Sequence, residues 1–500
     1  MNIAVRTLVA LAVASSCLGL QAAKKPRPKL DHAVQEEKGR CITYEAFTNA
    51  NPGLKLIGRL KTRSAKEIKS NRWSIGCECL DRDYADFDEY RDHVGALGCK
   101  YARIQSGWMK CERKKGVYDM AWLDEHVDGL REMSVEPWMC LCYGNPIYGT
   151  ESRLGGSIGQ VVRNPEAFAA WLAYCKAVVT RYRERVRIWE IWNEPFHQAE
   201  DYKVMVLETA KAIREVQPDA KVHVTSIHIN DYRPILEYLK EHGGLKLVNG
   251  WIYHSYARNP DDPIHGWWNY RKVDRTLKML REYDTGYYVI QGEGGCPAQL
   301  EYMSAMNNYG WTEYSQAKWV MRRMASDSIR SIPCHIYTII DQQYKHMLET
   351  FGLIRSSTLK LFGYKRPSYY GVQNMTAFFD DDVKPVRLEK PGCRILKRAD
   401  IRETGERSAS AAIYSRFGSS AVLVWYSDRT PSDAIEWDRC EVSIPGVSFS
   451  DPVWVEMVTG RVYEIADGSW RSADGATVFD DLPVWDCPSL IAERKDIILK

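Results

Sequence analysis

Two glutamates stand in sequence settings that are unusual for a solvated carboxylate. Glu194 follows an aromatic-rich apolar run and precedes Pro195, and Glu293 ends another apolar run within a glycine-rich segment. A lone glutamate at a strand end is more often solvated or salt-bridged. Here, proline stops the strand just after the carboxylate, and the glycines leave room for a ligand to approach closely. A facing pair of carboxylates can cleave a glycosidic bond, because one protonates the leaving oxygen while the other attacks or activates water.

The elements that would position these glutamates alternate between strand and helix patterns from residue 72 to residue 379. Eight such units predict an α/β fold, a (β/α)8 TIM barrel. An open doubly wound sheet is the alternative, but no G-x-G-x-x-G follows a strand. The predicted strands are 73–78, 101–105, 136–141, 186–191, 221–227, 248–254, 287–291 and 334–340, and the predicted helices are 87–97, 121–133, 165–183, 202–216, 234–242, 273–283, 315–329 and 369–379.

The barrel prediction brings the two glutamates together. Glu194 follows the fourth strand and Glu293 the seventh. Active sites of such barrels lie at the C-terminal ends of the strands, so the two carboxylates are expected to face each other across the barrel mouth.

The remaining chain is expected to form three further parts. Residues 1–23 are read as a signal peptide and 24–70 as a tail with one or two strands. The barrel occupies 71–380, and short alternating runs separated by turns predict a C-terminal antiparallel β-sandwich over 381–500.

The signal peptide predicts export to the periplasm, the cell surface or the medium. Arg6 precedes an apolar run and a small-residue cleavage region, and no later segment is long enough for a membrane span. A lipid anchor at Cys17 stays an alternative, because residues 14–17 loosely resemble a lipoprotein cleavage site without its usual leucine and glycine.

The composition limits the classes of molecule that the protein is expected to bind. The formal net charge is +3, spread along the chain without a basic run, which argues against nucleic-acid binding. The 17 Trp and 29 Tyr suit a core, with an excess that could stack on sugar rings. Cys77, Cys79, Cys140 and Cys142 lie in apolar strands without a histidine cluster, so we expect buried thiols rather than zinc. We expect no cofactor and no metal, and the sequence predicts no oligomeric state.

The segment Trp192-Asn193-Glu194-Pro195, with a second glutamate ending strand seven, resembles clan A of the glycoside hydrolases. Within the clan the sequence is most similar to family 39, and neighbouring family 5 is also a candidate. The resemblance covers roughly residues 72–378 and implies a retaining mechanism with Glu194 as acid/base and Glu293 as nucleophile.

The resemblance also implies supporting residues. Arg103 matches an arginine beside the nucleophile, and Asn193 matches an asparagine that binds the sugar 2-hydroxyl. His254 and Tyr256 match a His-x-Tyr element whose tyrosine hydrogen-bonds the nucleophile. Tyr337 departs from the pattern, since the family usually has a tryptophan platform there.

Weaker candidates complete the predicted site. Trp108 after strand two and Asn145 in a glycine-rich loop after strand three are expected to contact substrate. Glu78 is expected either to bind sugar hydroxyls or to pair with Arg82. The remaining weak candidates are His228 and Asn230, as sugar contacts, and Glu190, as a structural residue deeper in the barrel.

The expected function is a retaining glycoside hydrolase, β-xylosidase- or β-glycosidase-like, acting on a plant or microbial polysaccharide or oligosaccharide. Its two carboxyl groups should lie about 5–5.5 Å apart. The alternative is a non-catalytic carbohydrate-binding protein on the same scaffold. A transglycosylase shares the first chemical step and is not separated by the sequence.

Overall fold

The computed structural model describes residues 41–153, 156–226, 232–262, 269–283, 288–307, 309–400 and 405–500. The predicted signal peptide, Cys17, His228 and Asn230 lie outside these residues. Within them, no helix combines the length and the apolar character that crossing a bilayer requires.

Eight parallel strands close into the expected barrel. Their side chains are almost all buried, because the barrel interior lies on one face and the helices on the other. The strands are β2 (Trp73–Gly76), β3 (Tyr101–Gln105), β4 (Glu136–Leu141), β5 (Ile188–Ile191), β6 (Lys221–Ser226), β7 (Gly250–His254), β8 (Tyr288–Glu293) and β9 (Cys334–Ile336). The last strand is shorter than its apolar run, since the chain leaves the barrel at Tyr337.

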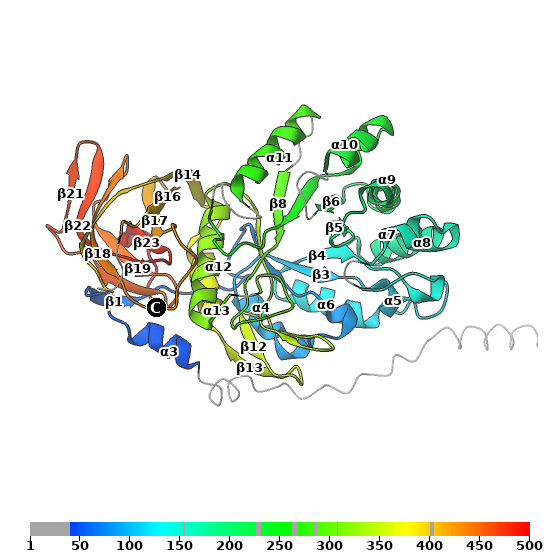
Figure 1. Cartoon of the computed structure of the whole chain (residues 1–500), viewed down its shortest axis with the longest axis horizontal. Coiled ribbons are helices and arrows are strands. Elements are labelled where there is room, and N and C mark those ends of the chain that lie inside the picture. The colour runs from blue at the N-terminus through cyan, green and yellow to red at the C-terminus, as the bar shows by residue number, and fades with distance from the viewer. Residues whose placement is uncertain are drawn as a thin grey trace, which may run out of the picture.

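Helices surround the barrel on the right of Figure 1. Several begin at residues that cap them. Asn164 accepts hydrogen bonds from two backbone N–H groups at the start of α8, and Thr312 forms a capping box with Ser315 at α12. The helices are α4 (Arg91–Ala96), α5 (Trp108–Cys111), α6 (Ala121–Glu132), α7 (Ile158–Val162), α8 (Pro165–Tyr182), α9 (Ala199–Val216), α10 (Tyr232–Glu241), α11 (Tyr270–Glu282), α12 (Glu313–Ser328) and α13 (Pro367–Phe378).

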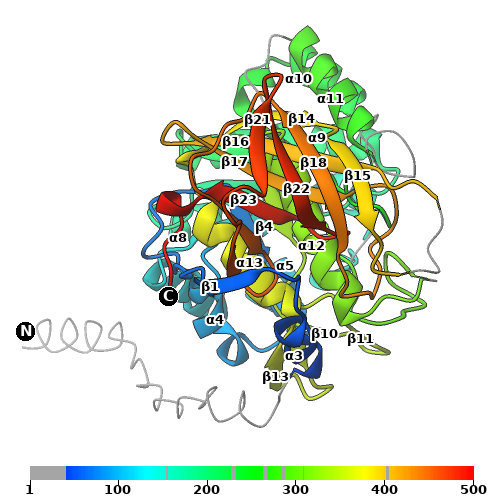
Figure 2. The ribbon, with the colours of Figure 1, turned by 90° about the vertical axis from the view of Figure 1, so that its left-hand side faces the viewer.

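Two antiparallel sheets form the C-terminal part, as expected, and Figure 2 views them face on. Alternating buried and partly exposed residues along strands such as β18 leave one face for the core between the sheets. The larger sheet runs β1 (Lys55–Arg59), β20 (Arg461–Glu464), β19 (Pro452–Glu456), β23 (Ser489–Glu493), β17 (Ser419–Tyr426), β16 (Ala409–Arg416) and β14 (Val383–Glu389). The smaller runs β15 (Gly392–Lys397), β18 (Asp438–Pro445), β22 (Ala476–Val484) and β21 (Trp470–Ala473).

The N-terminal segment belongs to this C-terminal part, which the sequence does not indicate. Helix α3 (Ile42–Asn49) leads into β1, which pairs antiparallel with β20 at the edge of the larger sheet. The backbone N–H of Lys61 then donates to the carbonyl of Ile498, so the two ends of the described chain lie together.

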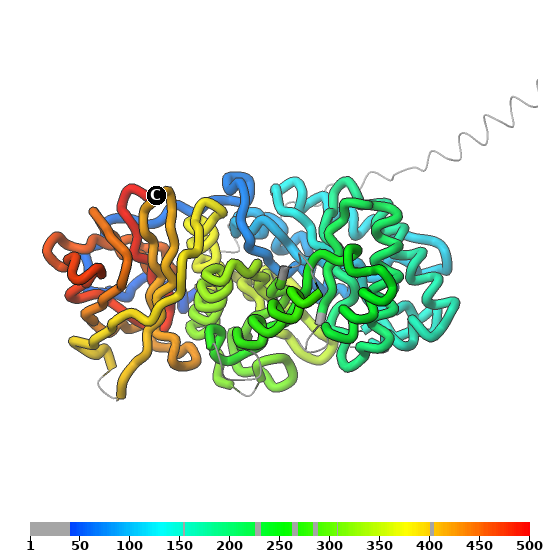
Figure 3. Tube along the Cα trace, turned by 90° about the horizontal axis from the view of Figure 1, so that it is seen from above, coloured from blue at the N-terminus to red at the C-terminus, as the bar shows by residue number. Residues whose placement is uncertain are grey.

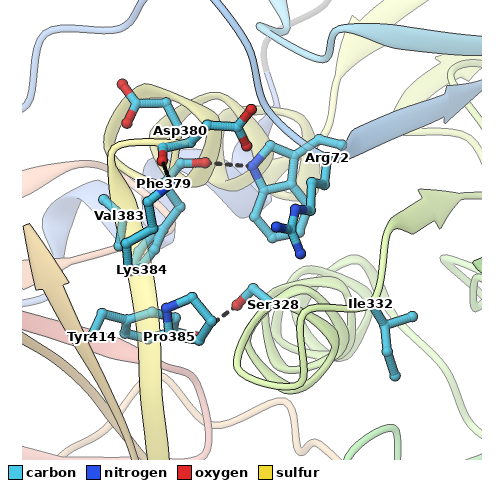
Figure 4. Close-up of a pocket in the computed structure, with 11 residues that line it drawn as sticks. Arg72, Ser328, Ile332, Phe379, Asp380, Val383, Lys384, Pro385 and Tyr414 are labelled. Atoms are coloured by element: carbon cyan, nitrogen blue, oxygen red, sulfur yellow. Dashed lines mark hydrogen bonds between the residues drawn. The ribbon is translucent and has the colours of Figure 1, made fainter. Parts of the chain in front are cut away.

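Helices α12 and α13 lie between barrel and sandwich (Figures 1 and 3). The Lys318 ammonium on α12 is fully buried, 2.6 Å from Asp486 of the sandwich. A small cavity of about 50 Å³ lies at this boundary, and Figure 4 shows the residues that line it. There, Ser328 of α12 and Tyr414 of β16 share a hydrogen bond of 2.6 Å. The boundary is therefore a packed interface with buried polar contacts.

Candidate active site

Glu194 and Glu293 lie at the C-terminal end of the barrel. Glu293 is the last residue of β8, and Glu194 follows β5 in a backbone with a positive φ of 50°. Left-handed backbone at a residue other than glycine is uncommon and concentrates at functional sites. Both side chains are 11% exposed, so each carboxylate borders solvent while most of it is buried.

Arg103 of β3 holds the base of the site together. Its guanidinium is fully buried and forms two hydrogen bonds, of 2.7 and 2.8 Å, with Glu190. It also donates to Glu293 at 3.0 Å and to the side-chain oxygen of Asn193 at 2.7 Å. Two parallel bonds to one carboxylate fix the plane of the guanidinium, which orients its remaining donors. Glu190 is thus the deeper, structural carboxylate that we expected.

Glu293 is stabilised as a carboxylate. The Tyr256 hydroxyl donates to its Oε1 at 2.7 Å, and Arg103 donates to its Oε2. Burial alone would raise the pKa of Glu293, but His254 and Arg103, together with the Tyr256 hydrogen bond, lower it below its ordinary value. A carboxylate that stays ionised is suited to act as a nucleophile.

Glu194 has a different partner. Its Oε1 lies 2.8 Å from Nδ1 of His254, the last residue of β7. Burial lowers the pKa of His254, but Glu293 and Glu194 raise it, and the net pKa lies above the ordinary value. This contact suits either protonation state of Glu194, because an imidazole nitrogen can donate to a carboxylate or accept from a carboxylic acid.

The two glutamates lie close together. One oxygen from each, together with a ring nitrogen of His254, all fall within 4.8 Å of one another. The same three groups are a donor set that a divalent cation could use. The Arg103 guanidinium and the Tyr256 hydroxyl already occupy the oxygens of Glu293, and the positive charge of Arg103 opposes a second cation at the same carboxylate.

Three solved structures share this architecture. A family 39 glycoside hydrolase from the gut symbiont Bacteroides cellulosilyticus WH2 superimposes with a TM-score of 0.61 at 14% identity, over 85% of this chain and 81% of that one. This chain has the same fold as that enzyme. A family 30 endoxylanase from Clostridium papyrosolvens C71 gives 0.53 at 11% identity, over 88% and 98% of the two chains. A family 30 subfamily 8 xylanase from Clostridium acetobutylicum gives 0.52 at 12%, over 87% and 97%. No protein-family model and no curated protein matches the sequence.

On this fold, Glu78 is part of the network around Arg103. It follows β2, is buried, and accepts a hydrogen bond from Arg103 at 3.1 Å. The same carboxyl oxygen shares a hydrogen bond with Nε2 of His335 at 2.9 Å. The expected pair with Arg82 does not form, because Arg82 instead contacts Asp81 and Gln105. His335 was missed by the sequence reasoning, although its place in the eighth strand, like that of Arg103 in the second, could have pointed to it.

Asn193 also has a second partner that the sequence did not predict. Its side-chain nitrogen donates to the hydroxyl of Tyr143 at 2.8 Å, and the Tyr143 ring lies 5.1 Å from the Arg82 guanidinium. Asn193 is therefore held from both sides, by Arg103 and by Tyr143, in one orientation beside Glu194.

Tyr337, the residue that departs from the family pattern, lies just past β9. Its ring is nearly buried, and its hydroxyl lies within hydrogen-bond distance of a Glu349 carboxyl oxygen, at 2.7 Å, and of the Gln342 side-chain oxygen, at 2.9 Å. Glu349 lies on the hairpin β10 (Gln342–Gln343) to β11 (Leu348–Glu349), which no sequence pattern indicated. Burial, opposed in part by the Tyr337 hydrogen bond and reinforced by Glu301 and Glu293, raises the pKa of Glu349 to about 8.

Trp108 and Asn145, which we expected to contact substrate, are both held inside the protein by Glu112. Trp108 is fully buried, its ring stacks on Tyr148, and its indole N–H donates to Glu112 at 2.5 Å. Asn145 is also fully buried, and its side-chain nitrogen donates to the Glu112 carbonyl at 2.8 Å. Both side chains stabilise the loops after β3 and β4, and neither is exposed for a substrate contact.

The glycines beside Glu293 are required by packing within the protein. A Cβ atom at Gly292 would overlap Ile252, and one at Gly295 would overlap the Tyr337 carbonyl oxygen. The close approach that we assigned to a ligand is therefore made by neighbouring strands of the same chain.

Proposed function

We propose that this chain is a retaining glycoside hydrolase in which Glu293 attacks the anomeric carbon and Glu194 protonates the leaving oxygen. Glu194 then deprotonates water, which releases the sugar with its configuration retained. Arg103 and Tyr256 keep Glu293 ionised, and Asn193 hydrogen-bonds the sugar 2-hydroxyl.

The observation that carries this proposal is that two neighbouring carboxylates have different hydrogen-bond partners. Glu293 has a guanidinium, a phenol and a lowered pKa, whereas Glu194 contacts an imidazole that can share a proton with it. Two carboxyl groups with such different partners can take different roles, one as the acid and the other as the nucleophile.

The separation of the two groups supports retention. One oxygen of Glu194 and one of Glu293 lie within 4.8 Å of each other. Retaining enzymes have carboxyl groups about 5–5.5 Å apart, and inverting enzymes about 6.5–9.5 Å, because the latter accommodate a water molecule between carboxylate and sugar.

The substrate that we propose is a β-linked sugar, such as a β-xyloside, from a plant or microbial polysaccharide or oligosaccharide. The similar solved structures include two xylanases, which supports this class by fold alone. Export through the predicted signal peptide would bring the enzyme to such substrates outside the cytoplasm.

The test is turnover of a panel of aryl β-glycosides by the wild type and by Glu194→Gln and Glu293→Gln. We expect each variant to lose about 10³-fold or more in kcat, since each removes a group that acts in the transition state. Glu241→Gln, an exposed position on α10, is the matched control. Proton NMR of the first-formed anomer measures retention directly.

Three results would contradict the proposal. Turnover that survives in both variants would exclude the carboxylate pair. Binding of oligosaccharides by calorimetry without turnover of any glycoside would favour the carbohydrate-binding alternative. Loss of wild-type turnover in EDTA, restored by a divalent cation, would assign Glu194, His254 and Glu293 to a metal.

A further inference from the structure

A second cavity lies at the opposite end of the barrel from the glutamates. Its volume is about 390 Å³, within the range of small-molecule sites. Its lining includes the first residues of four strands, namely Tyr101 of β3, Ile188 of β5, Lys221 of β6 and Cys334 of β9. Because the strands are parallel, their starts lie at one end of the barrel and the glutamates at the other.

The cavity leads from the surface into the barrel interior. Arg72 and Lys221 at its mouth are exposed, whereas Trp138 and Ile290 on its inner wall are each 3% exposed. Trp138, Ile290 and Ile252 form an apolar cluster of their own, with the half-buried Ile188 packed against it. The inner wall therefore carries a buried apolar patch.

One polar group on the inner wall lacks a partner. The indole Nε1 of Trp138 is buried and has no hydrogen-bond partner among the described residues. The ring is held edge-on to His223 and His335, with ring centres 5.7 and 5.8 Å away. A buried donor without an acceptor costs free energy, so a ligand that brings an acceptor gains more than its contact area provides.

The charges at the mouth favour an anion. Arg72 and Lys221 supply two cations against the single carboxylate of Asp381. Arg72 donates to the Ser331 carbonyl oxygen at 2.9 Å, and neither cation forms an ion pair with a carboxylate in the described part of the chain. His223, behind them, adds no charge near neutral pH, since burial, with Lys221 second, lowers its pKa to about 3.

We propose that this cavity binds a small aromatic acid. Its carboxylate would lie between Arg72 and Lys221 at the mouth, and its ring against Ile188, Ile290 and Trp138. An oxygen at the far end of the ring would accept the hydrogen bond of the Trp138 indole. This site is separate from the glutamates and does not depend on the proposed hydrolysis.

The experiment is isothermal titration calorimetry of the full chain with three matched probes. The first, 3-(4-hydroxyphenyl)propionate, has both the carboxylate and the far oxygen. The second, 3-phenylpropionate, lacks the oxygen, and the third, 3-(4-hydroxyphenyl)propanamide, lacks the charge. We expect the first to bind most tightly, and each of the others to bind at least about five-fold more weakly.

Variants assign the binding to this cavity. Lys221→Gln should weaken the acid about five-fold and leave the amide unchanged, while Lys211→Gln on α9 is the exposed-lysine control. Trp138→Phe should remove the preference for the hydroxylated probe. Ile188→Phe, which fills the mouth side of the apolar wall, should abolish binding of all three.

Glu293→Gln separates the two sites, because it should bind the acid as tightly as the wild type. Circular dichroism and thermal unfolding of each variant confirm that it folds. Equal binding of the three probes, no binding at millimolar concentration, or binding unchanged in folded Lys221→Gln and Ile188→Phe would overturn the proposal. None of these outcomes depends on glycoside turnover.

Discussion

At the residue scale, the site depends on which groups compensate for the burial of each carboxylate. Burial by itself disfavours ionised Glu293, and the structure opposes it with a guanidinium at 3.0 Å and a phenol at 2.7 Å. The Arg103 guanidinium is itself held by Glu190, Asn193 and Glu78, so its position does not depend on Glu293 alone.

Tyr256→Phe removes one of these compensating contacts without removing volume. The pKa of Glu293 should then rise toward its ordinary value of 4.5, and the acid limb of the kcat/KM profile should move to higher pH. We also expect kcat to fall about ten- to hundred-fold. Tyr369→Phe, a buried tyrosine that bonds a backbone carbonyl on α4, is the control. An unshifted acid limb would show that Tyr256 does not tune Glu293.

The raised pKa of Glu349 predicts that enzymatic activity falls at alkaline pH. With its pKa raised to about 8, it is neutral at lower pH and ionises as pH rises past that value. The groups that face it are Tyr337, Tyr344, Glu301, Glu293, Tyr256 and Cys79. A new negative charge near Glu293 should then lower activity, and Glu349→Gln should retain activity above pH 8.

Stability gives a second measurement at Glu349. A carboxyl group whose folded pKa is raised stabilises the fold below its ordinary pKa of 4.5, and this contribution is lost as pH rises toward about 8. Glu349→Gln should therefore gain more in melting temperature, relative to wild type, at pH 8 than at pH 4.5. An equal difference at both pH values would mean that the carboxyl does not titrate in this range.

At the element scale, the glycines around Glu293 fix how closely the strand ends approach. A Cβ at Gly295 would overlap the Tyr337 carbonyl and crowd Phe351, so Gly295→Ala must displace the chain beyond β9. We expect about 1–3 kcal/mol of destabilisation in denaturant unfolding, together with loss of activity. Gly310→Ala, where no atom lies within 4 Å of the new Cβ, is the control. Equal stability of the two variants would contradict this reading.

The elements themselves follow from periodicity, and the contacts between them do not. Strand and helix patterns located all eight barrel units, because a buried parallel strand and an amphipathic helix each leave a regular pattern. Trp108 and Asn145 had the right residue types in the right loops, but their side chains turned inward to Glu112. Loop direction depends on tertiary packing, which no local pattern encodes.

The network around Arg103 also contains contacts that local sequence patterns do not predict. Arg103, Asn193 and Tyr256 were found through their likeness to a known arrangement, and the structure places all three at the glutamates. Glu78 follows the first strand and His335 lies in the last, and these two strands become neighbours only when the barrel closes. No spacing in the sequence indicates that closure.

At the scale of the whole molecule, barrel and sandwich are joined by buried charges. Asp486→Asn would leave the fully buried Lys318 ammonium without its carboxylate, which should cost about 3–5 kcal/mol. Asp467→Asn, at an exposed position in the same part, is the control. Thermal unfolding should show one transition for both parts, shifted to lower temperature only in the first variant.

The pH dependence of this contact has a definite sign. Burial would raise the pKa of Asp486, but Lys318 and the Ser432 hydrogen bonds lower it below 3.8. Its contribution to stability is therefore present above pH 3.8 and lost as pH falls through the lower folded value. The difference between Asp486→Asn and wild type should shrink only in strong acid. A difference that shrinks near neutral pH would assign it to another group.

The position of β1 in the chain determines when the larger sheet can be completed during synthesis. It leaves the ribosome early, yet its partner β20 lies roughly 400 residues later, at the register Arg59 to Arg461. During that interval its backbone N–H and C=O groups have no sheet to join, although the barrel can already form from local units. Synthesis of the last forty residues supplies β20, which pairs with β1, and β23, which joins β19 to β17 in the middle of the sheet. A chain that stops short of β20 therefore carries an unpaired edge strand prone to self-association.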